Sequence, residues 1–264
     1  ATPFFDDVVR GERSDRGVWG YECLGMFRSY QEIEEYFAVN NITSYLGNSK
    51  DNVHPGMLIY SDQRGQRNAD GSYCEKDGVI DRNDYVKISN RVNNPWGFTL
   101  NLAGAYKNFT CSAQLGANWG AYGLVQTNLR QESYDDMEYK NLSAMWKDMY
   151  VYEDVLDANG NVVAAMNRNA KYPNLRYKEV NSQASTFWKV SAANIRLRNL
   201  TVAYNLPKEW LTPIGISSCR LNLTCQNLFS FYNPYENGVW DTWAGTYGNY
   251  PNLRKFTLGV NVSF

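Results

Sequence analysis

The sequence predicts an all-β fold: a segment of an antiparallel transmembrane β-barrel, with long extracellular loops that carry short helices. The first observation is the alternation of the last ten residues, which places apolar side chains on one face of a strand and small or polar ones on the other. The second is that the same alternation recurs in pairs of segments about ten residues long, enough to cross a bilayer at a tilt. Lipid would cover the apolar face and the lumen the polar one.

A strand is predicted at the carboxy terminus, and it ends on an aromatic residue. Its apolar positions are Phe256, Leu258, Val260, Val262 and Phe264. A strand of this kind is typical of the end of an outer-membrane barrel, where it serves assembly.

A hairpin is predicted in the middle of the chain. Apolar residues alternate over 96–106 and again over 109–119, and only Lys107 and Asn108 separate the two runs. Two strands joined by two residues make a tight hairpin.

A further pair of strands is predicted near the end, over 200–206 and 219–229, joined by a connection over 207–217. Upstream, Ile195 and Leu197 have the opposite phase, and a β-bulge near Arg198 and Asn199 would reconcile them. If the carboxy terminus is periplasmic, the two connections at 107–108 and 207–217 are periplasmic turns. Residues 122–189 and 232–252 then form extracellular loops, in keeping with short inner turns and long outer loops.

Short helices are expected at 31–37 and 141–150, where apolar residues recur at helical spacing. The chain is divided as follows: 1–95, strands and an extracellular loop with an Asp-rich turn; 96–121, a transmembrane hairpin; 122–189, an extracellular loop; 190–264, the last three strands. About five strands are clear, and five cannot close a barrel. We therefore expect further sequence to complete it.

Composition excludes several functions. Lys and Arg number 26 and Asp and Glu 27, so no basic surface for nucleic acid is expected. The chain has one histidine, His54, which rules out a Ser-His-Asp triad or a multi-histidine zinc site within it. Five cysteines without a Cys-x-x-Cys pair argue against a full disulfide framework. Acidic runs at 32–35 and 135–138 are interpreted as solvated charge, so no enzyme is predicted.

Six blocks together resemble the carboxy-terminal part of SusC/RagA-type TonB-dependent outer-membrane transporters. In chain order they are 21–35 (YECLGMFRSYQEIEE), 55–84 (opening PGMLIYSD and closing KDGVIDRND), 94–109 (NPWGFTLNLAGAYKNF), 185–206 (STFWKVSAANIRLRNLTVAYNL), 207–231 (PKEWLTPIGISSCRLNLTCQNLFSF) and 250–264. The resemblance implies a plugged barrel of about 22 strands. It also implies import of an oligosaccharide or peptide oligomer across the outer membrane of a Gram-negative, Bacteroidetes-type bacterium.

The resemblance implies partners as well. These are a SusD-like surface lipoprotein as a lid, TonB acting through a plug domain that lies outside these residues, and the barrel assembly machinery. No cofactor is expected, with one exception. Asp62, Asp77, Asp81 and Asp84 match part of an Asp-rich run that resembles a calcium loop in the family. About a dozen residues interrupt the run after Asp62, and a polar turn with Asx-type hydrogen bonds is the alternative.

Substrate contacts are expected from an aromatic outer loop with Trp240, Trp243, Tyr247 and Asp241, whose alternative role is loop packing. Arg196 and Arg198 would either line the lumen or pair with carboxylates of the plug. Two other functions remain open: a passive porin-type barrel and a soluble carbohydrate-binding β-sandwich.

Overall fold

The computed structural model describes residues 17–132, 143–235 and 252–264. The chain forms two compact units: unit 1 comprises 1–92 and 122–190, and unit 2 comprises 93–121 and 191–264. Among the described residues no helix is long and apolar enough to cross a membrane. Trp240, Asp241, Trp243 and Tyr247 lie outside the described residues, so their expected roles stay predictions.

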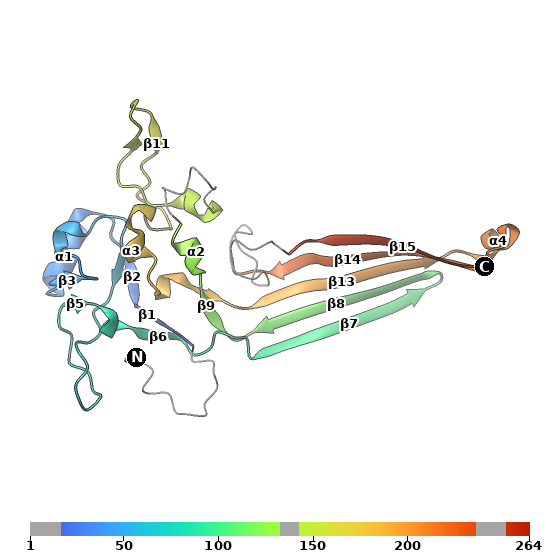
Figure 1. The fold of residues 1–264 in the computed structure, drawn as a ribbon, viewed down its shortest axis with the longest axis horizontal. Coiled ribbons are helices and arrows are strands. Elements are labelled where there is room, and N and C mark those ends of the chain that lie inside the picture. Colours follow the sequence, from blue (N-terminus) through green and yellow to red (C-terminus); the bar gives the residue numbers. More distant parts are fainter. Residues whose placement is uncertain (1–16, 133–142, 236–251) are drawn as a thin grey trace. The chain divides into compact units, whose positions relative to one another are not determined.

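Unit 2 is a five-stranded antiparallel sheet with the order β15-β14-β13-β8-β7 (Figure 1). Its strands are β7 (Trp96–Tyr106), β8 (Phe109–Trp119), β13 (Asn194–Asn205), β14 (Ser218–Tyr232) and β15 (Lys255–Ser263). Each predicted long strand is present, and the expected all-β fold class is confirmed. The connection predicted over 207–217 joins β13 to β14. It contains two short turns of helix, α4 (Lys208–Leu211) and η7 (Thr212–Ile214).

The predicted two-residue hairpin is confirmed, because β7 and β8 pair in one uninterrupted register from Trp96 opposite Trp119 to Tyr106 opposite Phe109. Lys107 turns the chain with φ of 52°. Strand β13 then adds to the other edge of β8, although about 75 residues separate them in the chain.

The predicted bulge is also confirmed. The register of β13 shifts between Leu197 and Asn199 against both neighbours. Against β8 the shift leaves Arg198 as the extra residue, whereas against β14 the extra residue lies in β14, between Gln226 and Phe229. Ile195 and Leu197 therefore share the apolar face with Ala117 and Leu115 of β8, despite their opposite phase in the sequence.

Unit 1 is built from short strands and helical turns around an aromatic core. Its elements up to residue 92 are β1 (Val18–Gly20), β2 (Cys23–Met26), α1 (Tyr30–Val39), β3 (Ser44–Tyr45), η1 (Lys50–Asn52), β4 (Leu58–Tyr60), β5 (Val79–Ile80), η2 (Arg82–Asp84) and β6 (Val86–Ser89). From residue 122 they are β9 (Tyr122–Leu124), α2 (Thr127–Arg130), η4 (Ala144–Asp148), β10 (Val155–Leu156), β11 (Val162–Ala164), η5 (Leu175–Tyr177), α3 (Lys178–Asn181), η6 (Thr186–Trp188) and β12 (Lys189–Ser191).

Helix α1 confirms the helix expected at 31–37. Ser29 caps its first turn by accepting from the Glu32 N–H (3.2 Å), and Ile33 and Phe37 bury its apolar side. The second expected helix is shorter than predicted: in the described part of 141–150, the helical turn is the 3₁₀ helix η4.

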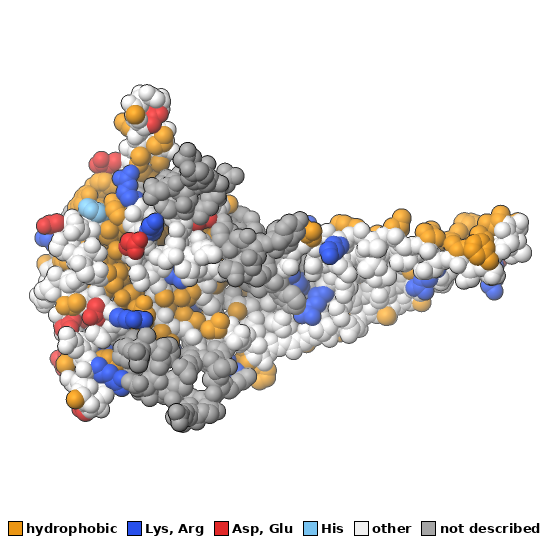
Figure 2. All heavy atoms as spheres, viewed as in Figure 1, with side chains coloured by type: hydrophobic (Ala, Val, Ile, Leu, Met, Phe, Trp, Pro, Cys, Tyr) orange, Lys and Arg blue, Asp and Glu red, His pale blue; other side chains and the backbone are white. Residues whose placement is uncertain are grey.

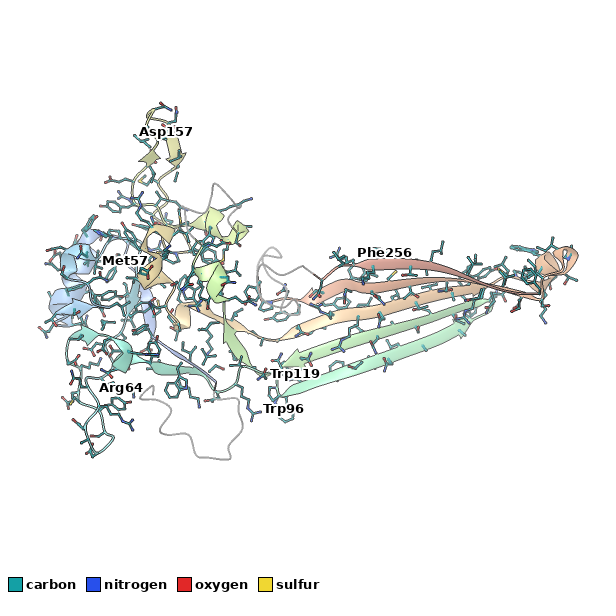
Figure 3. All side chains as sticks on the ribbon, viewed as in Figure 1. Met57, Arg64, Trp96, Trp119, Asp157 and Phe256 are labelled. Carbon is teal, nitrogen blue, oxygen red and sulfur yellow. The ribbon has the colours of Figure 1, made fainter. Side chains whose placement is uncertain are left out.

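Tyr45 and Asn181, two buried polar side chains in the core of unit 1, bond to backbone groups. The Tyr45 hydroxyl donates to the Leu58 carbonyl (2.6 Å) and accepts from the Tyr60 N–H (2.8 Å). The Asn181 amide joins three segments, since its oxygen accepts from the Leu58 N–H (2.8 Å) and its nitrogen donates to the carbonyls of Gly56 (3.0 Å) and Asn174 (2.8 Å). Met57, labelled in Figure 3, is 5% exposed and lies in the same core. These bonds avoid the cost of unpaired buried polar groups.

Candidate functional site: the two faces of the sheet and the aspartate turn

The strand registers sort the side chains of unit 2 onto two faces of opposite character. In the centre of the sheet, Val202 of β13 lies opposite Leu223 of β14, which lies opposite Leu258 of β15. One residue earlier, Thr201 lies opposite Thr224, and Thr224 lies opposite Thr257. An apolar row thus alternates with a polar row across the sheet, as in barrels that separate lipid from lumen.

The apolar face is exposed in this chain. Leu100, Leu102, Leu258 and Val260 are 45%, 51%, 75% and 57% exposed. Figure 2 shows hydrophobic side chains gathered on the surface of the sheet toward α4 and the carboxy terminus. An apolar surface of this extent is not left in water by an ordinary soluble domain.

Aromatic residues mark both ends of the apolar face. Trp96 and Trp119 are paired at one end (Figure 3), where Phe98 meets Trp119 edge-on with ring centroids 6.0 Å apart. At the other end Phe109 contacts Tyr204, with centroids 4.5 Å apart. Strand β7 rises by about 27 Å from Phe98 to Tyr106 and by about 34 Å from Trp96 to Tyr106. At a strand tilt near 40°, these lengths correspond to about 21 Å and about 26 Å along the membrane normal. That matches an apolar band of about 25 Å flanked by aromatic girdles.

A ladder of side-chain hydrogen bonds crosses the polar face. Gln114 of β8 donates to Asn101 of β7 (3.0 Å) and accepts from Asn199 of β13 (3.2 Å). The hydroxyls of Thr201 and Thr224 are 3.2 Å apart. These groups join neighbouring strands by their side chains in addition to the backbone ladder.

Arg220 spans a whole strand on the same face. It donates from β14 to the Thr110 hydroxyl of β8 (3.1 Å), although β13 lies between them. Ala203, opposite both Thr110 and Asn222, is 2% exposed, and its small side chain leaves room for this reach.

The structure places both predicted arginines on the polar face. Arg196 lies opposite Gly116 of β8 and is 4% exposed. The guanidinium of Arg198 lies over the same glycine, where an added Cβ would stand 2.4 Å from its Nε. Gly116 therefore admits the Arg198 side chain against the sheet. The five strands contain Arg196, Arg198, Arg220 and Lys255 but no Asp or Glu, so their polar face carries positive charge only.

The four aspartates of the predicted turn lie in unit 1, and each accepts a backbone N–H. Asp62 accepts from Gly78 (2.8 Å), Asp77 from Val79 (3.0 Å) and Asp81 from Asn83 (2.7 Å). Asp84 is fully buried and accepts from Gln63 (2.7 Å), Arg64 (3.2 Å) and Asp81 (2.8 Å). Asp81 and Asp84 form a capping box at η2.

Burial is the largest influence on the pKa of the Asp84 carboxyl. It raises the pKa of this carboxyl to about 6, and the nearby Asp62 adds to the rise, while the three backbone N–H groups act in the opposite direction.

A Ca²⁺ site would need six to eight oxygen ligands. One oxygen, Oδ1 of Asp62, is buried without a hydrogen-bond partner. Within residues 17–132, 143–235 and 252–264, however, no three His, Cys, Asp or Glu side chains converge as a metal site. The geometry favours the polar turn, and calcium binding stays a prediction through which we derive no step.

Sequence reasoning missed two features of these sites. Ala203 and Gly116 admit the arginines of the polar face, and their only signal is small size at alternate strand positions. Asn181 holds the core of unit 1 together through contacts with Gly56 and Leu58, more than 120 residues away, which no local pattern reveals.

Comparison with known proteins gives related sequences and structures. No protein-family model matches the chain. It is 25% identical over 259 residues to TonB-dependent receptor P26 of Formosa agariphila, which covers 93% of this chain and 22% of the relative. It is 33% identical over 110 residues to TonB-dependent receptor P3 of the same species, covering 37% of this chain and 11% of the relative.

Two solved structures share the fold. The RagAB peptide importer in its closed-closed state matches with a TM-score of 0.57 and 18% identity, covering 94% of this chain and 23% of that one. A second structure, of the RagAB peptide transporter, matches with a TM-score of 0.56 and 17% identity, covering 93% of this chain and 22% of that one. The chain thus spans less than a quarter of the length of these proteins. The resemblance to SusC/RagA-type TonB-dependent receptors is confirmed.

Proposed function

We propose that this chain is a wall-and-loop segment of a TonB-dependent importer in the outer membrane of a Gram-negative, Bacteroidetes-type bacterium. The importer would take up an oligomeric nutrient of glycan or peptide chemistry. The observation that carries the proposal is the two-faced sheet of unit 2, with an exposed apolar face between aromatic girdles and a hydrogen-bonded polar face. The similarity to TonB-dependent receptors supports the same function.

In this proposal the two faces have separate roles. The apolar face contacts lipid, and the polar face lines the lumen through which the nutrient passes. Arg196, Arg198 and Arg220 contribute positive charge to that lining, and the five strands themselves contain no Asp or Glu. Anionic or carbonyl-rich groups would be drawn along it.

Binding and passage, rather than covalent chemistry, are the proposed contribution of this segment. Energy would come from TonB acting on a plug, and a SusD-like surface lipoprotein would cover the mouth. A RagAB peptide importer is among the structures of similar fold, which supports a two-protein assembly. The aromatic loop with Trp240, Trp243, Tyr247 and Asp241 remains a proposed substrate contact.

Uptake in the native bacterium tests the proposal. The full-length protein would be deleted and restored in the native host, and uptake of labelled oligopeptides and oligosaccharides measured with and without TonB. We expect uptake that requires the protein, TonB and the co-purifying lipoprotein. Uptake that persists without TonB would favour the passive porin. Recovery of a folded protein of this sequence without detergent would favour the soluble β-sandwich.

A further inference from the structure

Unit 1 contains a cavity that none of the predicted site residues lines. Its volume is about 760 Å³, within the range of small-ligand sites. One wall is the β10–β11 hairpin with the residues that lead into it, and the other is the segment from Asn174 to Lys178. Asp157, at the tip of this hairpin, is labelled in Figure 3.

The hairpin wall is hydrogen-bonded at its tip and at its base. At the tip, the Asp157 carboxylate accepts from the N–H groups of Asn159 and Asn161 (both 2.8 Å). At the base, Val151 and Asn167 exchange two backbone hydrogen bonds of 3.1 and 2.8 Å. A wall held at both ends limits the ordering cost of binding.

Three tyrosines line the cavity, and their neighbours hold them in place. Tyr30 meets Tyr152 edge-on, with centroids 5.5 Å apart. His54 lies edge-on to Tyr30 at 6.3 Å and stacks on Tyr177 at 5.2 Å. On Tyr152 the Arg168 guanidinium lies 4.3 Å from the ring centroid and donates to the backbone carbonyl (2.9 Å). Large rings fixed in this way offer contact area at low entropic cost.

The two walls carry opposite charges. Glu153 and Asp154 lie on the hairpin side, while Arg176 and Lys178 lie on the other. In the described part of the chain, no ion pair joins one wall to the other. Asp154 is engaged with the Met166 N–H (2.6 Å), which makes Glu153 the more adaptable acid.

Apolar side chains also line the cavity. Val151, Val155, Val163 and Leu175 contribute to the lining, and Val163 is 64% exposed. A ligand that covers them must itself be partly apolar.

From this lining we propose that the cavity binds a short peptide with free ends, its ammonium group toward Glu153 and its carboxylate toward Arg176 and Lys178. A neutral oligosaccharide would leave both charged walls unused, and a polyanion would meet the two carboxylates. A zwitterionic peptide with apolar side chains complements the carboxylate of one wall, the positive charges of the other wall and the apolar lining. The inference rests on the proposed function, because it assigns a substrate class to an importer.

Binding to the purified full-length protein tests this inference. The probe is the peptide Ala-Leu-Leu-Ala, compared with its amino-acetylated form, its carboxy-amidated form and a neutral glucose hexamer. Capping either end is expected to weaken binding about tenfold. Glu153→Gln should abolish discrimination against the acetylated form only. The double variant Arg176→Gln, Lys178→Gln should abolish discrimination against the amidated form only. A benzophenone-bearing analogue should crosslink within 151–156 and 174–178.

Two matched variants control for charge alone. Glu179→Gln and Lys147→Gln change exposed residues of unit 1 that do not line the cavity, and both should bind as the wild type does. The inference is overturned if capped and free peptides bind equally, if crosslinks map elsewhere, or if the hexamer binds more tightly than the peptide. Normal TonB-dependent uptake with unchanged binding in the cavity variants would reject the peptide site alone. Peptide binding at the cavity without TonB-dependent uptake would reject the import function alone.

Discussion

Asp84 is a carboxyl whose ionisation is tied to the packing of unit 1. It is fully buried, yet it organises the turn by accepting three backbone N–H groups. Burial raises its pKa to about 6, from about 3.9 in an unfolded chain. The folded state therefore binds the proton more tightly than the unfolded state does. Protonation contributes stability below about pH 4, and this contribution is lost as the pH rises through about 6.

We expect Asp84→Asn to remove this pH dependence. A shift of about two pKa units corresponds to at most about 3 kcal/mol between pH 4 and pH 7. Hydrogen exchange of the 58–89 segment, corrected for intrinsic rates, should show wild-type protection falling relative to the variant as the pH rises. Asp77→Asn, at an exposed carboxylate of the same turn, should follow the wild type. A constant difference between wild type and Asp84→Asn across this range would contradict the prediction.

At the scale of elements, the long strands could be predicted because alternation over ten residues is a strong signal. The bulge at Arg198 followed from a change of phase. The strands of unit 1 are two to four residues long, too short for a period to be read, and tertiary pairing decides them. Helix α1 has a cap and an apolar stripe, whereas the expected helix at 141–150 reduces to the 3₁₀ helix η4, in which Met145 and Trp146 are buried.

Features of the candidate sites could likewise be predicted where a local sequence pattern marks them, but not where tertiary contacts create them. Arg196 and Arg198 could be predicted from their place near the outer end of one strand. The structure places Arg196 opposite Gly116 and the Arg198 guanidinium over the same glycine. The cavity of unit 1 joins Tyr30 to residues 151–178, and no local sequence pattern reports contacts over such separations.

An arginine introduced into β7 should affect the stability of the barrel differently on the two faces of the strand. Leu100 lies near the middle of the apolar face and Thr99 lies on the polar face. An arginine at position 100 would therefore face lipid, whereas an arginine at position 99 would not. Leu100→Arg should destabilise the full-length barrel in lipid vesicles by about 2–4 kcal/mol, whereas Thr99→Arg should have little effect. Unfolding in denaturant, followed by tryptophan fluorescence, measures both. Equal destabilisation, or a greater loss for Thr99→Arg, would reverse the assignment of the faces.

At the scale of the whole molecule, the sheet of unit 2 ends in two open edges. Strand β7 pairs only with β8, and β15 only with β14, within the described residues. Both edge strands are long, with 11 and 9 residues, and both have strongly apolar outer faces. Unpaired edges of this kind promote aggregation in water and cannot be left open inside a bilayer. Five strands are also too few to close on themselves.

We therefore expect both edges to pair, in the full-length protein, with strands that lie outside the described residues. In hydrogen exchange of that protein in lipid, the amides of 96–106 and 255–263 should be protected as strongly as those of 220–226, which pair with strands on both sides. The 154–164 hairpin, outside the sheet, should exchange faster and serves as an internal reference. If β7 or β15 exchanged at the rate of that hairpin while β14 stayed protected, the edge would be open. An open edge would mean that the sheet belongs to no closed barrel, and the import function built on a lumen would have to be abandoned.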